Sequence, residues 1–147
     1  MDEELRRMQS IVEEMFKAQN GIEGLNLLIP RINAVFQVMF GCDREKDSFK
    51  RIFADYCRVN HVDRFFLVSE SWMVQSAIGI DPSIRPSERS DRIEILVCAL
   101  ISVNGNEMGW AKIEEEGGKR ILGQWQNHQG EAQSPYWDEC LYRPSFN

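Results

Sequence analysis

The sequence predicts one α+β domain in which three N-terminal helices pack on a four-stranded antiparallel sheet. Apolar residues recur at steps of three and four before about residue 60 and at steps of two after it. Asn104-Gly105 and Gly117-Gly118 separate three apolar segments, as the turns of a meander do. At 147 residues the chain has the length of one domain, which we divide into a helical part (residues 1–60), a sheet (64–126) and an irregular tail that folds back (127–147).

The first and third helices are expected over residues 2–19 and 44–59. Asn20-Gly21 is a pair that ends helices, and Asp43 or Asp47 is the candidate N-cap of the third helix. Both segments carry an apolar stripe at helical spacing. The stripes are Leu5, Met8, Val12, Met15 and Phe16 in the first, and Phe49, Ile52, Phe53, Tyr56 and Cys57 in the third.

The second helix is expected over residues 30–40. Pro30 suits the first turn of a helix, and Gly41 suits its end. The apolar residues of this region fit a wide helical stripe, although residues 35–40 also alternate as in a strand. The helix is therefore the preferred interpretation, and a strand is the alternative.

Two strands are expected over residues 65–74 and 93–103, the second in a central position because it is apolar on both faces. Two-residue turns would place Ala99 opposite Trp110, Ile113 opposite Leu122 and Trp110 opposite Trp125. One sheet face would then carry Ile93, Ile95, Val97, Ala99, Ile101, Met108, Trp110, Ile121 and Trp125. The opposite face is also apolar, so the face without helices needs a cover. We expect the aromatic tail over residues 136–146 to provide it, with a second copy or a partner as the alternatives.

The charge distribution argues against nucleic-acid binding. The net charge is −6, and no region of the chain is basic, whereas duplex binding needs a stripe of Lys and Arg along the phosphates. The longest segment without a charged residue, 95–106, is too short to cross a bilayer. The acidic start Asp2-Glu3-Glu4 differs from a basic targeting peptide, which predicts a cytoplasmic protein.

The cysteines and histidines give no pattern of a metal or catalytic site. Cys42, Cys57, Cys98 and Cys140 are far apart in sequence, whereas zinc ligands come in close pairs, so we expect four reduced, metal-free thiols. His61 and His128 are the only histidines, and no nucleophile elbow or phosphate-binding glycine loop is present. The sequence thus predicts no cofactor, no metal and no catalytic residue.

One polar cluster is the candidate binding site. Glu70 lies in the middle of an apolar strand, where a carboxylate is costly unless it is paired. We expect Arg92 to be its partner if the two long strands are adjacent. The cluster consists of Glu70, Trp72, Arg89, Arg92 and Glu94. It is either a pocket beneath the loop over residues 75–91 or, as we prefer, an ion-pair network that fixes this loop.

The same segments resemble a family of small uncharacterised bacterial and phage-encoded proteins. The shared pattern is Glu-x-Trp at the end of a strand, then Pro-Ser-Glu, then Asp-Arg-x-Glu before an apolar strand. The matching residues are Glu70, Trp72, Pro86, Ser87, Glu88, Asp91, Arg92 and Glu94. The resemblance implies a phage or mobile-element origin and carries no known activity.

The expected function is that of a small, non-catalytic cytoplasmic protein that acts by binding another protein or by self-association. A small-molecule-binding protein or hydrolytic enzyme with a pocket of Glu70, Arg92 and Glu94 is the alternative. A third hypothesis is an acidic decoy that occupies the nucleic-acid-binding site of another protein. A deep cavity with Glu70 at its base would favour the enzyme. A flat apolar face would favour the binding protein.

Overall fold

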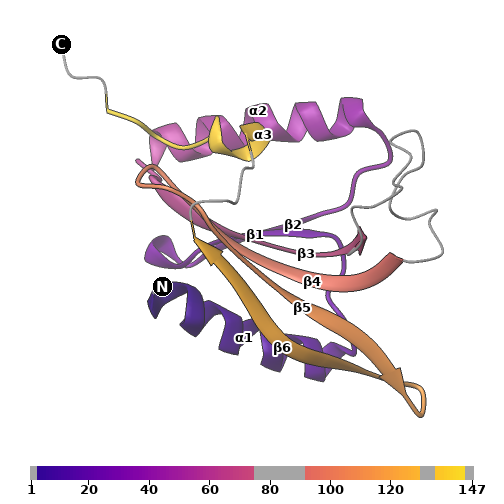
Figure 1. Ribbon diagram of the computed structural model, residues 1–147. Coiled ribbons are helices and arrows are strands. Elements are labelled where there is room, and N and C mark those ends of the chain that lie inside the picture. Colours follow the sequence, from indigo (N-terminus) through magenta and orange to yellow (C-terminus); the bar gives the residue numbers. More distant parts are fainter. Residues whose placement is uncertain (1–2, 75–91, 130–134, 145–147) are drawn as a thin grey trace.

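The computed structural model describes residues 3–74, 92–129 and 135–144. It contains a six-stranded antiparallel sheet with strand order β2-β1-β3-β4-β5-β6 (Figure 1). The strands are β1 (Leu25–Ile29), β2 (Ala34–Val38), β3 (Arg64–Val74), β4 (Arg92–Ser102), β5 (Glu107–Glu116) and β6 (Lys119–Gln129). The helices are α1 (Glu3–Gln19), α2 (Asp43–Val59) and the short α3 (Pro135–Asp138). The α+β class is confirmed, but the expected four-stranded sheet is wrong.

The two additional strands come from the region where the sequence predicted a second helix. Pro30 starts only one turn of 3₁₀ helix, Pro30–Ile32, and Asn33 then takes a left-handed conformation with φ of 57°. The chain reverses there, so that β2 pairs antiparallel with β1 and Leu27 lies opposite Phe36. Because residues 34–38 alternate between half-buried and exposed side chains, the period of two was the correct signal.

The other main elements match their predictions. The helices over residues 2–19 and 44–59 are α1 and α2, and neither Asp43 nor Asp47 caps α2 with its side chain. Instead, Glu45 accepts a hydrogen bond of 2.7 Å from the Gly41 backbone N–H just before the helix. The strands expected over residues 65–74 and 93–103 are β3 and β4, which pair with each other in the middle of the sheet.

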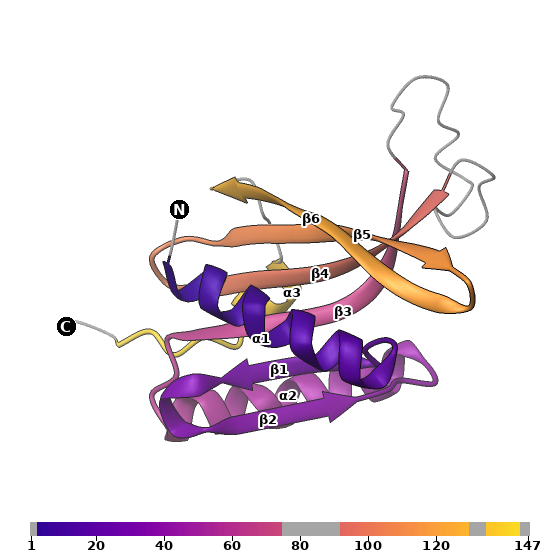
Figure 2. The ribbon, with the colours of Figure 1, turned by 90° about the horizontal axis from the view of Figure 1, so that it is seen from below.

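The helices cover both faces of the sheet, not one face as expected. Figures 1 and 2 show α1 on one side and α2 with α3 on the other. Consecutive residues of β3 explain this arrangement: Phe66 packs in the core under α1, and Phe65 packs in the core under α2. Since neighbouring side chains of a strand point to opposite faces, a strand that is apolar on both faces needs a layer on each.

The strand registers agree with the sequence near one turn and differ elsewhere. Ile113 lies opposite Leu122 as predicted, but a bulge between Ala111 and Ile113 places Trp125 opposite Ala111 and Trp110 opposite Gln126. Trp125 therefore packs on the α1 side instead of sharing a face with Trp110. The other turn is centred one residue earlier than predicted, since the Gly105 N–H donates to the Ser102 carbonyl. Ala99 consequently lies opposite Met108.

The described part of the tail packs on the sheet beside α2. Trp137, Cys140 and Leu141 are buried in the same core cluster as Phe53 of α2. The backbone N–H of Tyr142 donates to the Val62 carbonyl at 2.7 Å. The tail and α2 thus cover this face of the sheet together.

Gly109 of β5 offers a test of packing on the α1 side. A Cβ at this position would lie 2.5 Å from Asn127 Oδ1 and 3.2 Å from the Cys98 carbonyl oxygen, against the amide of Gln9. Gly109→Ala should therefore displace the 2.5 Å hydrogen bond between Gln9 and Asn127, and cost about 1–3 kcal/mol of unfolding free energy.

The measurement is urea unfolding, with Gly123→Ala as the matched control. A Cβ at Gly123 meets its nearest neighbour at an ordinary 3.6 Å, so this variant should unfold within about 0.5 kcal/mol of the parent chain. Equal stability of the two alanine variants would contradict the close contact at Gly109.

Candidate functional site

Glu70 is paired, as expected, but its cation is Arg120 rather than Arg92. Arg120 donates from both terminal nitrogens, Nη1 to Glu70 Oε2 at 3.0 Å and Nη2 to Oε1 at 2.8 Å. Glu70 Oε2 also accepts the backbone N–H of Ile22 at 2.6 Å. Both carboxylate oxygens of Glu70 are therefore occupied by groups of the protein itself.

Arg120 connects elements that are distant in sequence. It contacts Glu94 of β4 as well as Glu70 of β3, although it is the second residue of β6. Its backbone N–H donates to Asn20 Oδ1 at 2.9 Å, and its Nη1 donates to the Asn20 carbonyl at 3.3 Å. The cluster thus joins the end of α1, the connection to β1, and strands β3, β4 and β6.

The pKa values of the two carboxyl groups in this cluster shift in opposite directions. Burial opposes the ionisation of Glu70, but the hydrogen bonds from Arg120 and Ile22 outweigh it, so the pKa of Glu70 is lowered. Burial and the neighbouring Glu70 outweigh the attraction of Arg120 at Glu94, whose pKa is raised. The hydrogen bonds and charge of Glu70 raise the pKa of Arg120. The side chains are 18–32% exposed, so these interactions act in a largely desolvated environment.

The remaining predicted site residues divide into two groups. The Arg92 guanidinium lies over the Trp72 ring, 4.8 Å from the ring centre, and Trp72 is 41% exposed. Trp72 lies opposite Glu94 in the sheet, so these residues share the face of Glu70. Arg89, with Pro86, Ser87, Glu88 and Asp91 of the resemblance pattern, lies outside the described residues.

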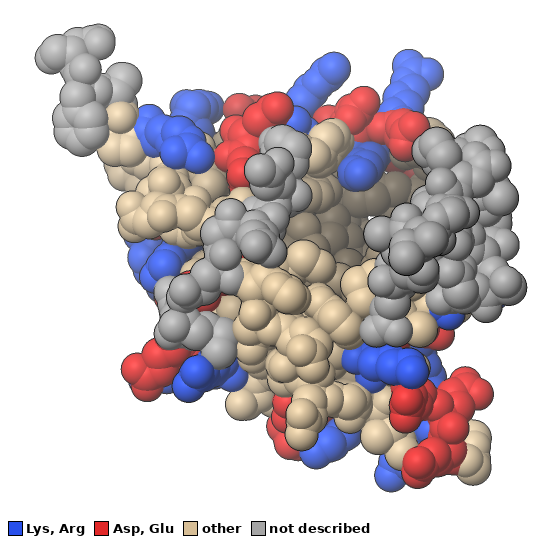
Figure 3. All heavy atoms as spheres, in the orientation of Figure 1, with Lys and Arg blue, Asp and Glu red and all other residues tan. Residues whose placement is uncertain are grey.

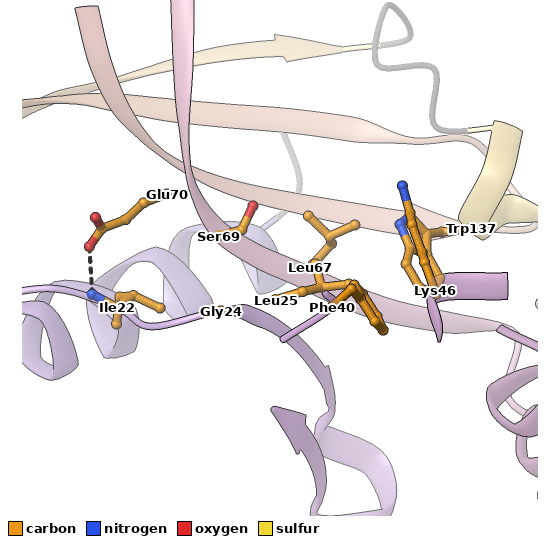
Figure 4. A pocket seen from close by; sticks show the side chains of 9 residues that line it. All are labelled: Ile22, Gly24, Leu25, Phe40, Lys46, Leu67, Ser69, Glu70 and Trp137. Atoms are coloured by element: carbon orange, nitrogen blue, oxygen red, sulfur yellow. Dashed lines mark hydrogen bonds between the residues drawn. The ribbon is translucent and has the colours of Figure 1, made fainter. Parts of the chain in front are cut away.

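One cavity that Glu70 borders lies mainly on the opposite face of the sheet. Its volume is about 570 Å³, and Figure 4 shows Glu70 turned away toward Ile22. The rest of its lining is Gly24, Leu25, Phe40, Lys46, Leu67, Ser69 and Trp137. Figure 3 shows a recess on this side, below a row of mixed acidic and basic side chains over α2. Glu70 is the acidic residue among the described residues that line this cavity, and both of its oxygens are already bonded within the protein.

The buried thiols do not form a reactive site. Burial raises the pKa of Cys57 and of Cys98 to about 12, and that of Cys140 to about 11, so these thiols stay protonated at neutral pH. All four cysteines are free thiols in the structure. Among the described residues, no group of three or more His, Cys, Asp or Glu side chains could hold a metal ion. Within the described part of the chain, no helix is long and apolar enough to span a bilayer.

An apolar surface lies along strand β2, at one edge of the sheet. Val35 is 62% exposed and pairs with Leu28, a residue of the core under α1, so it lies on the α1 side of this edge. Met39, just past the end of β2, is 76% exposed. On the other side, α2 exposes Ile52 and Val59 by 64% and 67%. Both flank Tyr56 on the helix, and the Tyr56 ring packs 4.9 Å from the ring of Phe36 in β2. We call β2 with Val35, Met39, Ile52 and Val59 the β2 edge surface.

The sequence interpretation missed both Arg120 and the β2 edge surface. Arg120 carried one signal, a guanidinium next to an apolar segment in the last strand, but nothing in the sequence linked it to Glu70. The β2 edge surface was hidden by the prediction of a helix over residues 30–40. Its signal was the alternation of residues 35–40.

Comparison of the chain with protein family models, with curated proteins and with solved structures finds no match.

Proposed function

We propose that this chain is a non-catalytic protein that acts by binding another protein, through the β2 edge surface. The observation that carries the proposal is the concentration of exposed large apolar side chains around one terminal strand of the sheet. Exposed aliphatic groups on both layers beside the same edge resemble an interface more than scattered surface residues.

Strand addition is the mode of binding that this edge supports. A terminal strand presents backbone N–H and C=O groups that an extended segment of a partner can pair with. In Figure 2, β2 lies at the free margin of the sheet, beyond α1. Val35 and Met39 would contact the added segment on one face, and Ile52 and Val59 would contact it on the other.

A second function is favoured by the opposite pKa shifts of Glu70 and Glu94. Two carboxyl groups with separated pKa values are typical of acid–base pairs in hydrolases. A cavity of about 230 Å³ borders Glu70 and Arg120 and could admit a small molecule. The complete pairing of Glu70 argues for a structural role instead, so we rank this function second.

A cytoplasmic location and a phage or mobile-element origin are further parts of the proposal. The location is supported by the four free thiols, which are typical of a reducing compartment. The origin rests on the Glu-x-Trp, Pro-Ser-Glu and Asp-Arg-x-Glu pattern of the sequence.

The test of the proposed function is a substitution that charges the edge. Val35→Lys should abolish or weaken partner binding about tenfold or more, since a lysine on an edge strand opposes strand addition. The measurement is affinity capture with the tagged chain from the native host, followed by titration of each retained protein in purified form. Because Val35 is 62% exposed, this substitution should leave the fold intact.

Two controls separate the proposed functions. Ile121→Lys changes an exposed apolar residue on the far strand β6 and should leave partner binding unchanged. Glu94→Gln should also leave it unchanged, whereas loss of a small-molecule activity in Glu94→Gln alone would support the hydrolase. Equal capture by the parent chain and Val35→Lys would exclude the β2 edge as the binding site.

A further inference from the structure

We infer that the partner at the β2 edge surface is a second copy of this chain, paired antiparallel through β2 about a twofold axis. This inference rests on the proposed function, and it names the occupant of the same surface. The two sheets would become one continuous sheet, with both α2 helices on the same face.

The distribution of charge favours a second copy at this edge and opposes it elsewhere. Two chains of net charge −6 repel each other, so a self-contact is favoured where the surface is uncharged. Residues 32–42 contain no charged side chain, and they include all of β2. A twofold contact brings each group near its own copy, so the lack of charge in residues 32–42 removes like-charge pairs along the two paired strands.

Helix α2, which lies over β2, could also pack against the α2 helix of a second copy. Ile52 and Val59 are seven residues apart, which places them on the same side of α2. Antiparallel pairing of β2 makes the two α2 helices antiparallel as well. Phe36, the central residue of β2, packs against Phe49, Phe53 and Tyr56 of α2, so the part of α2 that carries Ile52 lies over the middle of the strand. Ile52 would therefore lie near the twofold axis, and Val59 would lie farther out along the partner helix.

The two ends of the sheet differ in the features that prevent strand addition. The β6 end carries Lys119, Arg120 and His128, and the register shift between Ala111 and Ile113 distorts its pairing with β5. Lysines and bulges of this kind protect edge strands from pairing. Strand β2 has a regular register with β1 and no lysine, so it is the end of the described sheet that is open to a second copy.

The experiment is sedimentation equilibrium of the full chain between low and high micromolar concentration. The parent chain should have twice the 17.1 kDa mass of one chain. Val35→Lys and, independently, Ile52→Glu should shift the equilibrium to monomer, each weakening association by about tenfold or more. Ile121→Lys should remain dimeric, and far-UV circular dichroism should show that all three variants are folded.

Hydrogen exchange provides a measurement of geometry. The backbone amides of residues 34–38 should be protected in the dimer and lose protection on dilution or in Val35→Lys. A parent chain that is monomeric at high micromolar concentration would overturn the inference, as would a dimer that resists both Val35→Lys and Ile52→Glu. Open-ended association beyond the dimer would overturn it as well.

The same set of variants distinguishes failure of this inference from failure of the proposed function. A monomeric parent chain that binds a different protein, and loses it in Val35→Lys, would leave the proposed function standing with another occupant. A dimer that is insensitive to Val35→Lys, with no other protein bound at this edge, would exclude both.

Discussion

Trp137→Ala is expected to lower the free energy of unfolding by about 3–5 kcal/mol, as removal of a buried indole does in well-packed cores. Trp137 is 5% exposed, and its ring lies 6.2 Å from Phe49 and 6.3 Å from Phe53, both of α2. The indole thus fills the space between the tail and α2 over this face of the sheet. Its removal leaves a cavity in the core between α2 and the sheet, and it exposes the side of α2 that faces the tail.

Urea unfolding followed by far-UV circular dichroism measures this loss without relying on tryptophan fluorescence. Glu139→Gln is the matched control, because Glu139 lies in the same tail, 69% exposed, and pairs with Lys50 at 2.6 Å. It should unfold within about 1 kcal/mol of the parent chain. If a chain that ends at residue 129 is as stable as the parent, the tail does not support the core, and our assignment of the cover is incorrect.

The regular elements with one dominant period could be predicted from the sequence. Helices α1 and α2 and the long strands β3 and β4 carry apolar patterns whose period leaves little ambiguity. The prediction of a helix over residues 30–40 was wrong because the apolar residues of the region over 22–41 fit both the helical period and the strand period of two. The left-handed Asn33, which reverses the chain after Pro30, is a turn that the helix interpretation overlooked.

The prediction that all helices cover one face of the sheet was wrong for a related reason. A run of apolar residues in a central strand predicts burial on both faces, but it does not say which helix covers which face. Phe65 and Phe66 already required two cores, and placing all helices on one face contradicted that requirement.

The pairing of Glu70 was predictable from the sequence, but the identity of its cation was not. Glu70 could be recognised because a carboxylate in an apolar strand needs a cation. Arg120 could not, since it lies on β6, three strands away from β3 in the sheet order. Strand registers identify neighbours along the sheet, whereas this contact depends on how the twist of the sheet brings β6 toward the end of α1.

Arg120→Met is expected to lower the free energy of unfolding by about 2–4 kcal/mol at neutral pH. The loss is smaller than for a fully buried ion pair, because the side chains of Arg120, Glu70 and Glu94 are 18–32% exposed. The methionine keeps most of the side-chain volume but leaves Glu70 and Glu94 close together without their cation. Urea unfolding of both chains between pH 3 and 7 is the measurement. Arg120→Lys keeps one charge without the paired geometry, so it should restore part of the loss.

The pH dependence follows from the lowered pKa of Glu70, whose ordinary value is 4.5. A carboxyl group with a lowered pKa in the folded state stabilises the fold above its ordinary pKa, and this contribution is lost as the pH falls through the lowered value. In Arg120→Met, burial without the cation favours the protonated Glu70, so the variant loses stability as the pH rises. The difference between the parent chain and Arg120→Met should therefore be largest at neutral pH and shrink below about 4.5. A difference that stays constant from pH 3 to 7 would mean that Arg120 stabilises the fold through packing on Phe16, 5.5 Å below its guanidinium, and not through the two carboxylates.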